Sequence, residues 1–139
     1  MLVIVHPDSI HERNYNFVDG YFKHILKLID YRNDTIIISR LYRKFPDQCP
    51  GLQEKISLFY KEIKNRDIKV IDEQSTTDQT GNLGLGIIET YQPQDVDICG
   101  CFWFGHCKMC CEETAENLRM FGFNVHPLWD YISTMDKVF

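Results

Sequence analysis

The sequence lacks an excess of basic residues, a long apolar run and any internal repeat. Its 139 residues include 15 Lys and Arg against 20 Asp and Glu, which gives a formal net charge of -5. Nucleic acids and anionic membrane surfaces are bound through clustered Lys and Arg, so we expect neither of them as a partner. The opening residues MLVIVHPDSI have no basic leader and only a short apolar run, which predicts neither a signal peptide nor a membrane span. These absences favour a cytoplasmic protein.

Cysteine is the residue type whose distribution is most uneven. Five of the six cysteines lie between Val96 and Ser133. A disulfide scaffold spreads its cysteines through loops and is typical of secreted chains, whereas this cluster falls on a predicted strand, turn and helix. We therefore expect free thiols rather than a disulfide framework.

Hydrophobic periodicity predicts an α/β fold in a single domain of residues 1–139. Short apolar runs alternate with segments whose apolar positions recur about every 3.6 residues, the signature of a three-layer sandwich with a mostly parallel sheet. We expect the strand order 2-1-3-4-5 in a Rossmann-like, five-stranded sheet. The expected strands are Leu2–Val5, Thr35–Leu41, Ile68–Asp72, Val96–Phe102 and Val125–Trp129, and the expected helices cover Phe17–Ile29, Leu52–Asn65, Leu83–Tyr91 and a fourth segment that ends before Gly122.

The segment from Val96 to Ser133 carries the most chemistry. It reads as strand, turn, helix and strand, and its turn follows the carboxyl end of the first strand, where open α/β sheets place their ligands. A thiol at a helix start lies beside unpaired backbone N–H groups, which favour the thiolate and can also hold an oxyanion. Either Cys107 or Cys110 is placed to be this thiol.

The order of several residues in this segment resembles a known family. They are Cys99-Gly100, Cys110, Thr114-Ala115, Gly122 and Asp130. The chain is similar in this respect to the isochorismatase-like cysteine hydrolases, which include nicotinamidases and carbamoyl-amide hydrolases. The resemblance implies an isochorismatase-like fold and a small-molecule hydrolase whose thiolate attacks an amide-type or related substrate. We expect no cofactor and no metal.

The chain departs from the family pattern at the other catalytic positions. The family has an Asp at the end of the first strand, where this sequence has His6, with Asp8 two residues later. The family also has a Lys after a later strand, where Asp72 and Glu73 stand here. We expect His6 or Asp8 to deprotonate the nucleophile, although a histidine at this position can also simply end a strand. The spacing to Thr114-Ala115 favours Cys110 as the nucleophile, and the distance from Gly100 favours Cys107.

Aromatic residues flank both strand ends of this unit. Trp103, Phe104 and Trp129 can form the apolar wall of a pocket for a small planar ligand, or they can be core residues. The expected partner is accordingly a small-molecule substrate or ligand, and homo-oligomerisation is possible for such a sheet.

Two other classes of function remain open. The missing Lys is consistent with a non-catalytic fold relative that binds a small ligand or a protein partner. The Cys-x-Cys and Cys-x-x-Cys pairs are consistent with a dithiol redox or zinc-binding protein, although burial is the simpler explanation for Cys99 and Cys101, which share one face of a strand. The residues that could form such a centre are Cys99, Cys101, His106, Cys107, Cys110 and Cys111.

Overall fold

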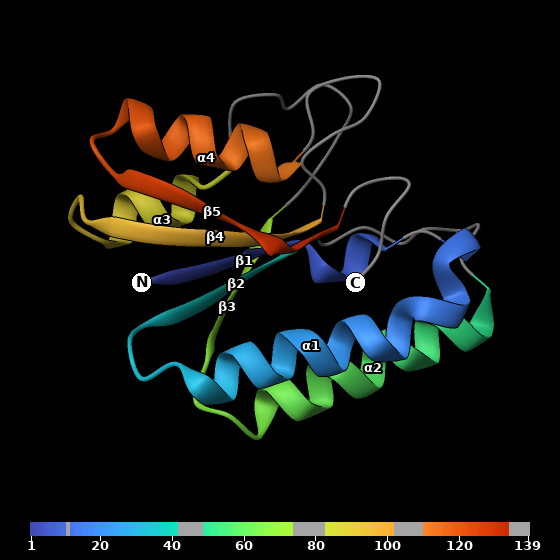
Figure 1. The fold of residues 1–139 in the computed structure, drawn as a ribbon. Helices are drawn as coiled ribbons and strands as arrows, with labels where there is room; N and C mark the ends of the chain where they lie inside the picture. Colours follow the sequence, from blue (N-terminus) through green and yellow to red (C-terminus); the bar gives the residue numbers. More distant parts are fainter. Residues whose placement is uncertain (11, 42–48, 74–82, 102–109, 134–139) are drawn as a thin grey trace.

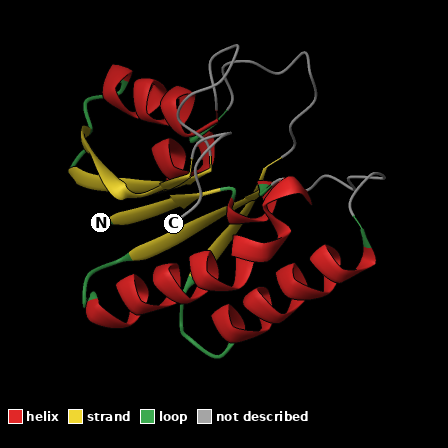
Figure 2. Ribbon diagram, turned by 45° about the vertical axis from the view of Figure 1, so that its right-hand side comes forward, coloured by secondary structure: helices red, strands yellow, loops and turns green. Residues whose placement is uncertain are grey.

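The fold is built on one parallel sheet covered by helices on both faces (Figures 1 and 2). The computed structural model describes residues 1–10, 12–41, 49–73, 83–101 and 110–133. The strands are β1 (Leu2–Val5), β2 (Ile36–Leu41), β3 (Lys69–Glu73), β4 (Asp95–Cys101) and β5 (Asn124–Ser133). The helices are α1 (Val18–Tyr31), α2 (Pro50–Lys64), α3 (Leu85–Thr90) and α4 (Cys110–Met120), with short 3-10 segments η1 (Pro7–Ser9) and η2 (Glu12–Phe17).

The strand order is β3-β2-β1-β4-β5, so the expected order 2-1-3-4-5 is wrong. All four strand pairs are parallel, and β3 lies at the outer edge beside β2 instead of between β1 and β4. The reason lies in the helices. Phe22 of α1 stacks on Phe59 of α2, with ring centroids 4.4 Å apart, so both helices cover the same face (Figure 1). Two right-handed crossovers on one face move the chain outward in one direction, from β1 to β2 to β3.

The next crossover uses the opposite face. Helices α3 and α4 lie on that face (Figure 1), and the same handedness now carries the chain back past β1 to β4 and β5. The direction of winding therefore reverses between β1 and β4. A crevice at the carboxyl ends of the strands forms at such a switch point, and ligands of open α/β sheets bind there.

Several element boundaries differ from the expected ones. Strand β5 continues past Trp129 and Asp130 to Ser133, and its register with β4 shifts between Ile98 and Gly100. Helix α4 begins at Cys110 in the described part of the chain and ends as expected before Gly122, which has φ +90. Glycine is favoured in this left-handed conformation after a helix, so the predicted C-terminal signal is confirmed.

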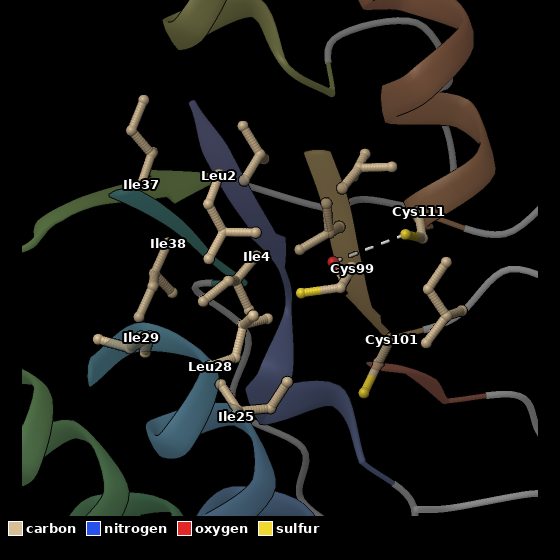
Figure 3. Close-up of a cluster of buried hydrophobic side chains, with 14 of the residues drawn as sticks. Leu2, Ile4, Ile25, Leu28, Ile29, Ile37, Ile38, Cys99, Cys101 and Cys111 are labelled. Carbon is tan, nitrogen blue, oxygen red and sulfur yellow. Dashed lines mark hydrogen bonds between the residues drawn. The ribbon is translucent and has the colours of Figure 1, made fainter. Parts of the chain in front are cut away.

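The core fills the space between the sheet and both helical layers. Strand β1 is fully buried along its whole length, as its uninterrupted apolar run predicts for a central parallel strand. Figure 3 shows Cys99 and Cys101 among the buried apolar side chains, and both are completely buried. The interpretation of these two cysteines as core residues is confirmed. No helix in the described ranges is both long and apolar enough to cross a membrane.

Candidate active site

Three elements bring a histidine, a carboxylate and a thiol together at the carboxyl edge of the sheet. His6 follows β1, Glu73 is the last residue of β3, and Cys110 is the first residue of α4. The three residues are far apart in the sequence, and only the parallel sheet with its switch point places them in one region. The geometry of each is set by a different local feature.

His6 is fully buried and has an unusual backbone conformation. Its φ is 44° and its ψ is 53°, the left-handed region that few non-glycine residues adopt, although histidine is among the more tolerant ones. The backbone N–H of His6 donates to the carbonyl oxygen of Ser39 at 2.8 Å, which holds the residue against β2. Such conformations persist where the surrounding structure enforces them, and they are concentrated at functional sites.

The His6 ring is paired with Glu73. Its Nε2 lies 3.0 Å from Oε2 of Glu73, and only 9% of the Glu73 side chain is exposed. Burial alone would lower the pKa of His6, but the interactions with Cys110 and Glu73 outweigh it and raise this pKa to about 9. The imidazole is therefore positively charged at neutral pH. Burial would also raise the pKa of Glu73, yet the contact with His6 lowers it below its ordinary value.

Cys110 faces the same ring. The other ring nitrogen of His6, Nδ1, is buried and makes no hydrogen bond of ordinary geometry to any described residue. The Cys110 thiol nevertheless interacts with the ring strongly enough to raise the pKa of His6. Catalytic hydrogen bonds are often long or poorly aligned without a substrate and tighten when one binds. The order of groups is thus thiol, imidazole, carboxylate.

Glu73 is held from its other side as well. Its Oε1 accepts a hydrogen bond of 3.1 Å from the backbone N–H of Gly84, just before α3. With one oxygen on Gly84 and the other on His6, the carboxylate fixes the orientation of the imidazole. The sequence singled out Asp72 and Glu73 only as residues standing where a Lys was sought. Because side chains alternate along a strand, only one of these two adjacent acids can face the α3 and α4 layer.

Cys110 lies at the start of helix α4 as the structure describes it. The first N–H groups of a helix have no partner within the helix, and Cys110 is half-buried at that end. The next residue is different, because Cys111 is fully buried and its thiol donates to the carbonyl oxygen of Cys99 at 3.7 Å (Figure 3). Burial raises the pKa of Cys99, Cys101 and Cys111, which keeps these three side chains as thiols.

Asp8 belongs to the region but is not arranged as a base. Its Oδ1 accepts hydrogen bonds from the Tyr60 hydroxyl at 2.8 Å and from the Leu41 backbone N–H at 3.4 Å. Burial raises the pKa of Asp8, and the hydrogen bond from Tyr60 acts against this shift. Of the two bases expected from the sequence, His6 is the one placed against Cys110.

Of the remaining predicted site residues, Trp129 alone lies in the described part of the chain. Cys107, Trp103 and Phe104 lie outside the described residues. Trp129 lies on the edge strand β5, separated from β1 by β4, and 52% of it is exposed. It is therefore not a core residue, and its role in substrate binding stays a prediction.

Part of the alternative metal or dithiol centre lies in the described residues. Within the described ranges, no group of three His, Cys, Asp or Glu side chains is arranged to hold a metal ion. The described cysteines are free thiols. His106 and Cys107, two members of the suggested centre, lie outside the described residues.

The fold and the cluster together define a class of site, a thiol, imidazole and carboxylate in series at the switch point of a parallel α/β sheet. Comparison with protein-family models, with characterised proteins and with solved structures gives no match to this chain.

Proposed function

We propose that the chain is a thiol-dependent hydrolase of amide-type or related small-molecule substrates. In this proposal Cys110 is the nucleophile, His6 transfers protons and Glu73 orients and charges the imidazole. The observation that carries the proposal is the buried His6–Glu73 contact of 3.0 Å on the ring that Cys110 faces. A nucleophile, a base and a third group that orients the base are the recurring signature of covalent catalysis by side chains.

The reaction would proceed through an acyl-enzyme. The Cys110 sulfur, its proton already on His6, attacks the carbonyl carbon of the substrate, and the negative charge moves to the carbonyl oxygen. In this proposal the first N–H groups of α4, which have no partner within a helix, stabilise this oxyanion. The carbon–nitrogen bond then breaks as the imidazolium gives its proton to the departing amine. His6 next takes a proton from water, and the resulting hydroxide attacks the thioester. The carbon–sulfur bond breaks, which releases the acid and leaves the Cys110 thiolate beside the protonated His6, as at the start.

The fold assignment within this proposal is Rossmann-like and isochorismatase-like. The order β3-β2-β1-β4-β5 matches the first five strands of the doubly wound order 3-2-1-4-5-6, which supports the former. The sequence resemblance around Cys110 supports the latter. The proposal differs from the family in its supporting residues, because His6 and Glu73 stand in place of the family Asp and Lys.

An activated ester tests this function without knowledge of the natural substrate. After incubation with p-nitrophenyl acetate, we expect a burst of p-nitrophenol and an acetyl thioester on the peptide that contains Cys110. Cys110→Ser should abolish both. His6→Gln should slow acylation by about 10²- to 10⁴-fold, the usual contribution of a general acid–base group.

The matched control is Cys49→Ser, which removes another half-buried cysteine, at the start of α2, and should change neither result. An acetyl group spread over several cysteines, or a rate unaffected by His6→Gln, contradicts the proposed mechanism and favours a non-catalytic relative that binds a ligand or partner.

A further inference from the structure

Asp8 is a buried carboxylate two residues beyond His6, and it takes part in no step of the proposed reaction. Only 8% of the residue is exposed. Burying a carboxylate is costly unless hydrogen-bond donors replace the lost water. Two donors from different elements do so here, the Tyr60 hydroxyl from α2 and the Leu41 backbone N–H from β2.

These contacts attach the turn after β1 to the rest of the fold. Asp8 lies within η1, a turn closed by the hydrogen bond of 2.9 Å from the Ser9 N–H to the His6 carbonyl oxygen. The Asp8 carboxylate then ties this turn to β2 and to α2. Because the left-handed conformation of His6 sets the direction of its ring, a loosened turn would change how His6 faces Cys110.

Asp8 also interacts with His6 by charge. Burial raises the pKa of Asp8, whereas the positive charge of His6 acts in the opposite direction. An interaction between two charges is mutual, so an ionised Asp8 also stabilises the imidazolium. The other ionisable groups that interact with one or the other member of this pair are Glu73, Cys110, Tyr60, Arg40 and Cys101.

We propose that Asp8 is a positioning residue, whose carboxylate, held by Tyr60 and the Leu41 amide, fixes the turn that presents His6 to Cys110 and supports the charge of the imidazolium. This inference rests on the proposed function, in which His6 acts on Cys110. It assigns Asp8 no proton transfer and no contact with substrate.

Asp8→Asn tests the inference, because it removes the charge and keeps the shape. We expect the titration midpoint of His6, followed by NMR of the imidazole and assigned with His6→Gln, to fall by about 0.5 to 1 pH unit. The rate of Cys110 alkylation by iodoacetamide at pH 7 should fall by about three- to tenfold, since one pH unit corresponds to a tenfold change in the ionisation equilibrium. A lower unfolding temperature with an unchanged midpoint indicates a structural role only and overturns the inference.

Tyr60→Phe provides a milder second variant, which keeps the Asp8 carboxylate and removes one donor. It should reduce the alkylation rate by about two- to threefold at pH 7. If Asp8→Asn does not fold, an unchanged rate in Tyr60→Phe overturns the inference by itself.

The two proposals fail in different ways. If wild-type Cys110 is unreactive, the proposed function fails, while the His6 midpoint still decides the role of Asp8. If Cys110 is reactive and Asp8→Asn changes neither its rate nor the His6 midpoint, the inference fails and the proposed function stands.

Discussion

At the scale of single residues, the central feature is a buried histidine that carries a positive charge. Burial opposes this charge, and Glu73 together with Cys110 overcomes that opposition. The carboxylate is itself fixed by the Gly84 N–H, so it cannot turn away from the ring without losing a second hydrogen bond. This arrangement raises the pKa of the imidazole that Cys110 faces.

Glu73→Gln removes the negative charge while retaining an amide that can still contact His6 and Gly84. We expect the alkylation rate of Cys110 at pH 7 to fall by about tenfold or more, because an opposite charge at hydrogen-bond distance shifts a pKa by about one to three units. Measuring iodoacetamide incorporation at Cys110 by mass spectrometry checks this result.

Glu62→Gln is the matched control for this substitution. Glu62 forms an ion pair with Arg66 on α2 and has 54% of its side chain exposed, so the same chemical change there should leave Cys110 unaffected. Equal losses in both variants contradict a specific role for Glu73.

His6, Asp8 and Cys110 could be selected from the sequence because each follows a readable local pattern. His6 and Asp8 end an apolar run, and Cys110 precedes a helical period. Glu73 could not be selected, because β3 ends in two adjacent acids. Which of the two side chains faces the site depends on how the strand is placed in the sheet. In the structure Asp72 forms an ion pair with Arg40 at 2.6 Å, whereas Glu73 contacts His6.

At the scale of elements, β1 and β4 approach so closely that one position between them requires glycine. Gly100 has φ +118, and a Cβ atom placed on it would lie 2.1 Å from the carbonyl oxygen of Val5. Val5 immediately precedes His6, and Gly100 lies on the strand that leads to α4. The close contact of the two strands therefore sets the separation between the two sides of the site.

Gly100→Ala should destabilise the fold by at least about 3 kcal/mol, because both the backbone conformation and the space exclude a side chain. Urea unfolding followed by circular dichroism measures the change. Gly20→Ala in α1 is the control, since nothing lies within 4 Å of its added Cβ, and it should stabilise the protein by about 0.5 to 1 kcal/mol. Similar stabilities for the two variants contradict the close contact.

The alternation of strands and helices could be predicted from the sequence, because each element has its own hydrophobic period. The strand order could not, because it depends on which face each helix covers. The aromatic stack between Phe22 and Phe59 places α2 beside α1 and so sends β3 outward. Nothing in either helix sequence alone identifies the other as its partner.

At the scale of the whole molecule, the buried pair makes stability depend on pH in two directions. The pKa of His6 rises from its ordinary value of 6.5 to about 9 in the folded chain. A raised pKa contributes stability that is fully present below pH 6.5 and is lost as the pH rises through about 9. The pKa of Glu73 is lowered from 4.5, so its contribution is present above that pH and is lost as the pH falls.

We therefore expect the free energy of unfolding to be highest between about pH 5 and 6.5 and to decline by about 2 to 3 kcal/mol towards pH 10. Chemical denaturation at a series of pH values measures this profile. His6→Gln should lose most of the alkaline decline, whereas an identical decline in that variant shows that other groups cause it.

The central claim is that the fold makes Cys110 a nucleophile through His6 and Glu73. The most direct test compares the rates at which iodoacetamide modifies Cys110 and Cys49 in the same folded protein at pH 7, because both cysteines are half-buried at helix starts and only Cys110 faces His6 in the described structure. We expect Cys110 to react at least about tenfold faster, with the difference lost in His6→Gln. Equal rates for the two cysteines in the unmodified chain would contradict the account.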